Sequence, residues 1–243
     1  MADTGLSPRE GEGPETTGPS RSDPLDSFLR RAGATIIEHD GVLVAEDFGS
    51  VAGEVALGQR AVGVADRSEL AKWQLSGRPE QLDSMVGLFT GARREPAVAV
   101  HAAGGWWCTL APDRLLVIAE PRERAGMSNR LNAASDIGVS EVSARYTAIA
   151  VVGPRAGVLL RAAGMPGSDP VPDELRSLEV GGHPAHVLSE GPESFLVLVG
   201  EADAVPTWEA LLEVGHALGV GLVGRQALER LAISARTRAR QGY

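Results

Sequence analysis

Apolar and polar residues follow two patterns along this chain, each in short blocks. In some blocks apolar residues recur every three or four positions, which is typical of amphipathic helices, and several of these blocks begin at Pro or end at Gly. In other blocks, short runs rich in Val, Ile, Leu and Trp stand between turn-forming residues, which indicates strands. We therefore expect helices over residues 23–33, 50–61, 79–89, 121–134, 154–164 and 202–218. We expect strands over residues 34–37, 70–75, 97–102, 106–111, 114–120, 146–153, 176–180, 184–190 and 194–200.

The order of these elements predicts an α+β fold built from two related mixed-sheet subdomains. Neighbouring strands such as those on either side of Pro112-Asp113 are joined by tight turns, which favours antiparallel or mixed sheets over a parallel one. The same kinds of element occur twice, so we divide the ordered chain into a first half over residues 23–145 and a second half over residues 146–235. Residues 1–22 contain almost no large apolar side chain, which predicts a disordered N-terminal tail, and we expect a frayed C-terminal tail over residues 236–243.

The composition argues against several classes of function. The 23 basic and 32 acidic residues give a formal charge of −9 without a basic block, which disfavours nucleic acid as a partner. Cys108 is the sole cysteine, so an intrachain disulfide or a cysteine-based zinc site is excluded. No apolar run approaches the roughly 20 residues that span a bilayer, and no signal-peptide pattern is present, so we expect a cytoplasmic protein without a membrane partner. Lys72 is the only lysine, a bias typical of GC-rich bacterial genomes.

One glycine motif suggests a nucleotide site, but its context argues against that function. Residues 219–224 read Gly-Val-Gly-Leu-Val-Gly, whereas a dinucleotide site needs such glycines directly after a strand and at the start of a helix. The residues before them, with Trp208, Leu211 and Leu218 at helical spacing, predict a helix instead. We therefore expect the glycines to join one helix to the next, and we expect no NAD.

The histidines and serines give no strong catalytic signal either. His183 and His186 would lie on opposite faces of an extended segment, so we expect no metal site there. No Gly-x-Ser-x-Gly sequence is present to expose a nucleophilic serine on a sharp turn. Trp106 and Trp107 are adjacent, so on a strand one of them faces the core and the other becomes a candidate wall for a flat ligand.

Arg225 stands out among the arginines near the C-terminus. It comes directly after the glycine motif and starts the last predicted helix, where a cation opposes the helix dipole unless an anion compensates it. We therefore treat Arg225 as a candidate contact for an anion or a carboxylate.

Taken in order, several segments resemble the glycine-cleavage T-protein family of aminomethyltransferases, whose folate-binding fold also occurs in sarcosine and dimethylglycine oxidases. The resemblance spans residues 23–235. The segments that carry it are Asp23 to Ala34, Gly49-Ser50-Val51 with Glu54, the run Arg60 to Ser68 with its Gly-x-x-Asp-x-Ser turn, Ala148 to Pro154, Ser194-Phe195, residues 207–215, and Gly221 to Leu228.

The resemblance implies a site in which the pterin of tetrahydrofolate lies in a central channel beside a carboxylate and near an arginine-bearing helix. Arg225 matches the family's Gly-x-x-Arg position. No carboxylate follows Gly104-Gly105, where the family keeps its catalytic aspartates, and Leu196 stands where the family has the glutamate that holds the pterin. The expected ligand-binding residues are Arg225, Glu193, Trp106, Trp107 and Tyr146, and the catalytic residue is unassigned.

Three functions follow from this resemblance. The first is a remodelled, tetrahydrofolate-dependent enzyme of one-carbon or aminomethyl transfer that acts on a small-molecule ligand. The second is a non-catalytic subunit resembling the gamma subunit of heterotetrameric sarcosine oxidase, which would work with a larger oxidase or transferase subunit. The third is a repurposed enzyme of specialised metabolism that binds no folate. Because the sequence ends shortly after the Arg225 helix, we expect the family's C-terminal barrel to be absent.

Overall fold

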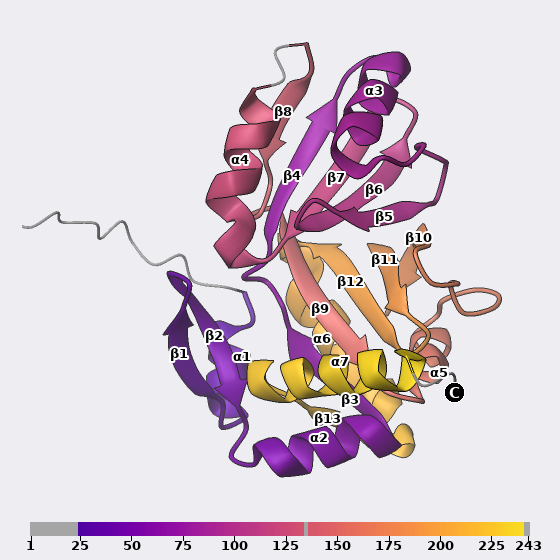
Figure 1. Cartoon of the computed structure of the whole chain (residues 1–243). Coiled ribbons are helices and arrows are strands. Elements are labelled where there is room, and N and C mark those ends of the chain that lie inside the picture. Colours follow the sequence, from indigo (N-terminus) through magenta and orange to yellow (C-terminus); the bar gives the residue numbers. More distant parts are fainter. Residues whose placement is uncertain (1–23, 134–135, 241–243) are drawn as a thin grey trace, which may run out of the picture.

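The structure is a computed structural model that describes residues 24–133 and 136–240. The described part of the chain begins with a short helix, a hairpin and a second helix, seen at the lower left and bottom of Figure 1. These elements are α1 (Asp26–Arg31), β1 (Thr35–His39), β2 (Val42–Asp47) and α2 (Val51–Arg60). Ser50 begins α2, because its hydroxyl accepts a hydrogen bond from the Gly53 amide at 3.2 Å.

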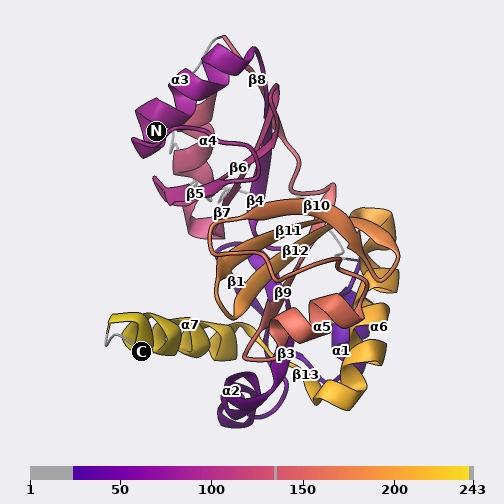
Figure 2. The ribbon, with the colours of Figure 1, turned by 90° about the vertical axis from the view of Figure 1, so that its right-hand side faces the viewer.

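A contiguous segment of the chain forms a five-stranded antiparallel sheet in the upper part of Figure 1. Two helices, α3 and α4, cover one face of it, on the left of the strands in Figure 2. The proline at the start of α3 and the left-handed Gly91 just after it explain why the sequence predicts this helix so well. In chain order the elements are β4 (Ala71–Ser76), α3 (Pro79–Thr90), β5 (Ala99–Ala102), β6 (Gly105–Ala111), β7 (Arg114–Ala119), η1 (Pro121–Glu123), α4 (Arg124–Asn132) and β8 (Gly138–Glu141).

The remaining strands form a six-stranded mixed sheet with the order β10-β11-β12-β9-β3-β13. Only the pair β13 and β3 runs parallel. The strands are β3 (Val62–Asp66), β9 (Tyr146–Val152), β10 (Leu175–Val180), β11 (His183–Gly191), β12 (Ser194–Gly200) and β13 (Val220–Leu222). The helices of this part are α5 (Ala156–Ala162), η2 (Glu201–Asp203), α6 (Ala204–Gly215), η3 (His216–Leu218) and α7 (Arg225–Arg240).

The two sheets repeat one topology. In the five-stranded sheet, β4-α3-β6-β7-α4-β8 is a strand-helix-strand-strand-helix-strand unit with β5 added at its edge. In the six-stranded sheet, β9-α5-β11-β12-α6-β13 is the same unit with β10 added at its edge and β3 inserted between β9 and β13. The predicted α+β fold with two related mixed-sheet subdomains is therefore confirmed.

Three apolar cores stack through the molecule. The first lies between the six-stranded sheet and α1, α5 and α6, with the fully buried Trp208 of α6 at its centre. The second is shared by both sheets and by α2 and α7. The third lies between the five-stranded sheet and α3 and α4, around Trp73 and Trp107. The sheets are also joined at their edges, where the Leu175 amide donates to the Ala97 carbonyl at 2.8 Å.

The structure differs from the predicted elements in a few places. Strands β2, β3 and β8 were not expected. Strand β13 occupies residues 220–222, so the prediction that the glycine motif joins helix directly to helix is wrong. The boundary at residues 145 and 146 stays a prediction, and β3, which precedes it, pairs with β9, which follows it. The tail predicted over residues 1–22 lies outside the described residues, and α7 continues to Arg240.

Candidate functional site

The centre of the junction between the two sheets is a layer of fully buried apolar side chains, which we call the dry layer. On the six-stranded sheet Leu188 and Leu196 pair across neighbouring strands and belong to the shared core. Cys108 and Leu116 of the five-stranded sheet complete this layer, and all four side chains are fully buried. Close packing of this kind leaves no vacant channel through these residues.

A group of charged and polar side chains borders this dry layer, and we call it the junction cluster. It brings together residues from five places in the chain. The loop after β3 supplies Arg67 and Glu69, and Glu120 directly follows β7. The end of β11 supplies Glu190, and the start of β12 supplies the Ser194 hydroxyl. The junction cluster consists of Arg67, Glu69, His101, Trp106, Glu120, Glu190 and Ser194.

Short contacts hold the junction cluster together. Arg67 donates from Nε to Glu69 Oε1 at 2.6 Å and from Nη2 to Glu120 Oε1 at 2.8 Å. Ser194 Oγ donates to Glu190 Oε2 at 3.2 Å. The cluster is open to solvent at Glu120, whose side chain is 47% exposed.

Hydrogen bonds from neighbouring residues fix the conformation of the loop that carries Arg67. The Asp66 carboxylate accepts hydrogen bonds from the Ser68 amide at 3.0 Å and from the Ser68 hydroxyl at 2.5 Å. Lys72, which is fully buried, donates from Nζ to the carbonyls of Ser68 at 3.2 Å and Leu70 at 2.9 Å. The position of Arg67 is therefore set by the fold before any ligand arrives.

The electrostatics of the junction cluster favour an added positive charge. Three carboxyl groups surround one guanidinium. Burial raises the pKa of Glu190, and nearby Glu120 adds to this rise, although Arg67, the hydrogen bond from Ser194 and nearby His101 oppose it. Burial works against the charge on Arg67, yet the carboxylates of Glu69, Glu120 and Glu190 outweigh it and raise the pKa of the guanidinium. Glu190 is thus a carboxyl group whose ionised form lacks full compensation.

The aromatic residues predicted for the site lie in different places. Trp106 is half-buried beside the junction cluster, with its ring centroid 4.7 Å from that of His101. Trp107 points to the opposite face of β6, where it is buried, stacks on Phe89 at 5.4 Å and donates from Nε1 to the Ala102 carbonyl at 3.2 Å. Tyr146 lies at the start of β9, with its ring centroid 6.0 Å from that of His186. Of these three aromatic residues, only Trp106 therefore belongs to the junction cluster.

Glu193 lies in the turn between β11 and β12, one residue before Ser194. Its carbonyl accepts a hydrogen bond from the Gly153 amide at 2.8 Å, which ties the turn to the end of β9. The backbone of Glu193 thus connects the turn before Ser194 to the end of β9.

Arg225 lies away from the junction cluster, in a network that fastens α7 to β2. It donates from Nε to Glu46 Oε2 at 2.7 Å and from Nη2 to Glu46 Oε1 at 2.8 Å, and Gln226 donates to Glu46 Oε1 at 2.6 Å. Arg225 also pairs with Glu229 one turn along the helix. The hydrogen bonds from Arg225 hold the pKa of the Glu46 carboxyl below its usual value, although burial opposes this. The anion that compensates Arg225 is thus a side chain of this protein.

A second carboxylate occupies the start of α7. Glu54 of α2 accepts hydrogen bonds from the amides of Phe48 and Gly224, each at 2.8 Å. A Cβ atom at Gly224 would come within 2.4 Å of the Glu46 carbonyl oxygen, so only glycine fits there. The glycine motif therefore serves close packing of the chain on itself, and its helix terminus already carries an internal anion.

The residues present do not fit tetrahydrofolate in the manner that the resemblance implies. Leu196 is fully buried in the dry layer, where it offers no acceptor to a pterin, and unpaired pterin donors would cost about 1 to 3 kcal/mol each. Strand β6 carries no carboxylate, and Arg225 is paired with Glu46. We derive no reaction step through folate.

Sequence reasoning did not identify the junction cluster beyond Trp106. Arg67 lies within the Gly-x-x-Asp-x-Ser turn, so its segment was noticed but the side chain was not. Glu120 and Glu190 follow strands that read as ordinary apolar runs, and no local spacing links them. Their common location depends on the pairing of the two sheets.

Other possible site features lie apart from the junction cluster. One hollow of about 540 Å³ lies between α3 and α4, and another of about 370 Å³ is lined by Thr109, Leu110 and Ser177 among others. Within residues 24–133 and 136–240, no three His, Cys, Asp or Glu side chains are grouped to hold a metal ion. The helices in the described part of the chain include none with the length and apolar character needed to cross a membrane.

Comparisons with known proteins give structural matches only. Neither a family model nor a curated protein sequence matches the chain. The glycine cleavage system aminomethyltransferase T from Bartonella henselae matches with a TM-score of 0.71 and 18% identity, over 84% of this chain and 59% of that protein. A chain of the heterotetrameric sarcosine oxidase from Corynebacterium sp. U-96 matches with a TM-score of 0.62 and 18% identity, over 83% of this chain and 97% of that chain. This chain therefore has the fold shared by glycine cleavage T protein and sarcosine oxidase.

Proposed function

We propose that the chain is a remodelled protein of the aminomethyl-transfer type that binds a small amine, without folate, at the junction cluster. The observation that carries this proposal is the excess of carboxyl groups around Arg67, among which Glu190 is the one whose pKa burial raises. A protonated amine would supply the missing positive charge.

The neighbours of Glu190 suit such a ligand. Ser194 fixes one carboxyl oxygen of Glu190, and the Glu120 carboxylate is partly exposed. Trp106 offers a half-buried ring against which methyl groups or a cation would lie. In this arrangement Glu190 holds the ammonium and is the group placed to take a proton from its nitrogen.

Calorimetry with sarcosine tests this proposal. The matched probe is N-acetylglycine, which keeps a carboxylate but has no basic nitrogen. We expect sarcosine to bind and N-acetylglycine not to bind. Glu190→Gln should weaken sarcosine binding by about 10- to 100-fold, because a charge-assisted hydrogen bond is lost. The control Glu209→Gln, at an exposed glutamate on α6, should leave the binding unchanged.

The pH dependence and a folate titration complete the test. Sarcosine affinity should rise as the pH rises through the elevated pKa of Glu190, because the ionised carboxylate is the form that attracts the cation. Equal affinity for the Glu190→Gln variant would refute the assignment of this residue. Binding of 5-formyltetrahydrofolate to the isolated chain would refute the folate-independent site.

A second candidate function is that of a small subunit in an oxidase-type complex. It is favoured by the extent of the match to the heterotetrameric sarcosine oxidase, which covers 97% of the matching chain. Co-expression with the larger subunits of a heterotetrameric sarcosine oxidase tests the idea. A stable complex on size exclusion supports the subunit function, and two separate peaks argue against it.

A further inference from the structure

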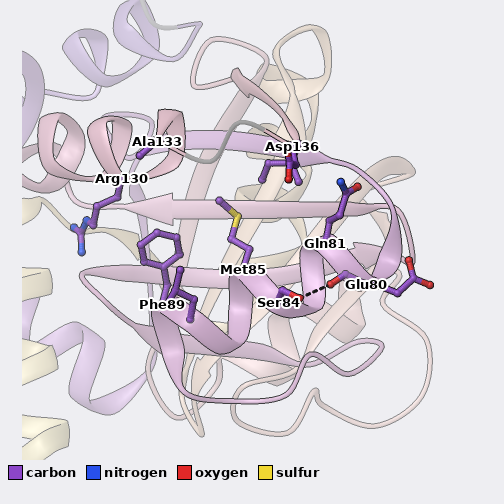
Figure 3. A pocket seen from close by; sticks show the side chains of 10 residues that line it. Glu80, Gln81, Ser84, Met85, Phe89, Arg130, Ala133 and Asp136 are labelled. Atoms are coloured by element: carbon purple, nitrogen blue, oxygen red, sulfur yellow. Dashed lines mark hydrogen bonds between the residues drawn. The ribbon is translucent and has the colours of Figure 1, made fainter.

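A groove between α3 and α4 lies on the outer face of the five-stranded sheet, far from the junction cluster in the layer order of the fold (Figures 1 and 3). We call it the α3–α4 groove. Its volume is about 540 Å³. It is lined by Glu80, Gln81, Ser84, Met85, Leu88, Phe89, Arg130, Ala133, Asp136 and Ile137.

The floor of the α3–α4 groove is apolar and rigid. Met85 and Phe89 lie one turn apart on α3, and Phe89 stacks on the buried Trp107 beneath it at 5.4 Å. Leu88 of the same helix is 80% exposed, more than any other large apolar side chain in the described ranges. Leu88 and the apolar floor beside it together give this face an apolar surface that a second protein chain can cover.

The two ends of the α3–α4 groove carry opposite charges. Arg130 of α4 lies at one end, and Glu80, at the start of α3, lies at the other end together with Asp136 (Figure 3). Glu80 is exposed, and the Arg130 side chain is 37% exposed, with its Nη2 atom 3.9 Å from the Glu123 carboxylate of the same chain. A twofold rotation about an axis through the middle of the groove exchanges its ends. It therefore brings the Arg130 end of one copy opposite the Glu80 end of the other.

We propose that the α3–α4 groove is the interface of a symmetric dimer of this chain. Leu88 of each copy enters the apolar floor of the other, and two equivalent Arg130–Glu80 pairs close the ends. The self-complementary charge pattern selects a second copy as the occupant, because an isologous interface must match its own surface after a twofold rotation. The dimer does not depend on the amine site.

Sedimentation equilibrium of the full chain, from low to high micromolar concentration, tests this proposal. We expect the mass to rise from the 25.4 kDa monomer to twice that value. Leu88→Asp should weaken the dimer by about a hundredfold, since the leucine is lost from both halves of the interface. Val171→Asp, at an apolar residue that is 62% exposed and belongs to another loop, is the matched control and should leave the dimer intact.

Charge-reversal variants test whether Arg130 of one copy faces Glu80 of the other, as this interface requires. Arg130→Glu alone and Glu80→Arg alone should each weaken the dimer by about tenfold, because like charges then face each other at both ends. The double variant should recover the wild-type affinity. A wild-type chain that stays monomeric, a dimer that tolerates Leu88→Asp, or a double variant without recovery would each overturn the proposal. Thermal melting of every variant confirms that it is folded.

Discussion

Removing the Glu54 carboxylate should weaken the whole fold, because this side chain connects three separate elements. Glu54 is only 7% exposed and accepts one amide hydrogen bond from Phe48, just after β2, and one from Gly224, just before α7. Both distances are 2.8 Å. Hydrogen bonds to a charged group contribute about 1.5 kcal/mol or more each, so Glu54→Ala should lower the free energy of unfolding by about 3 kcal/mol.

Glu54→Gln should lower the free energy of unfolding by about half as much as Glu54→Ala. The amide keeps one acceptor oxygen, while its NH₂ group cannot accept the second hydrogen bond. Natural domains have about 5 to 15 kcal/mol of stability in total, so a loss of about 3 kcal/mol is easily measured. It is large enough to distinguish the two variants.

Equilibrium urea unfolding is the assay for these variants. Glu209→Ala, an exposed glutamate on α6, is the control, and it should change the unfolding free energy by less than about 0.5 kcal/mol. If Glu54→Ala behaved like Glu209→Ala, the two amide contacts would contribute nothing to stability. The hydrogen bond from Gly224 to Glu54 would then not be what holds the start of α7 in place.

Three further stability predictions follow from buried groups. Arg225→Ala should lower the free energy of unfolding by about 2 kcal/mol at neutral pH, because Glu46 loses its bidentate ion pair. Since this pairing lowers the pKa of Glu46, the loss of stability should shrink as the pH drops through that lowered pKa. Leu196→Glu should destabilise the chain by about 3 kcal/mol or more, because it places a carboxylate in the dry layer, whereas Leu196→Met should cost less than about 1.5 kcal/mol. Glu190→Gln should stabilise the unliganded chain at neutral pH, because burial raises the pKa of the native carboxyl.

The same measurements can contradict these three predictions. An Arg225→Ala cost that is equal at neutral and acidic pH would show that the Glu46 charge is not involved. Leu196→Glu with wild-type stability would mean that water reaches this residue. The gain from Glu190→Gln should be absent below the ordinary carboxyl pKa of 4.5, grow as the pH rises from there to the raised folded pKa, and stay constant above it; a gain that persists in acid would contradict its electrostatic origin.

The elements that the sequence predicted best are those with strong local signals. Pro79 begins α3 and Gly91 follows its last turn, and Ser50 begins α2. Strand β3 was missed because its buried run Val-Gly-Val-Ala shows no alternation, and its role emerges only when it pairs with β9 and β13. Strand β8 is mostly exposed and short, so it has no hydrophobic pattern to reveal it.

The site was harder to predict because its contacts join distant parts of the chain. The partner of Arg225 is Glu46, which lies 179 residues earlier, and no spacing rule connects them. Likewise, Glu120 reaches Arg67 across 53 residues. The helix dipole argument predicted correctly that Arg225 needs an anion, but it could not tell an internal carboxylate from a ligand.

The five-stranded sheet has a consequence for how the chain is synthesised and folds. Its strands and helices all lie between β3 and β9 in the sequence, so every strand pairing within it forms inside a single contiguous segment. The enclosing sheet, by contrast, is complete only when Val220 pairs with Val62. Contacts between residues so far apart form slowly. During translation this contiguous segment can fold as soon as it leaves the ribosome, while β3 keeps one edge unpaired until β13 has emerged.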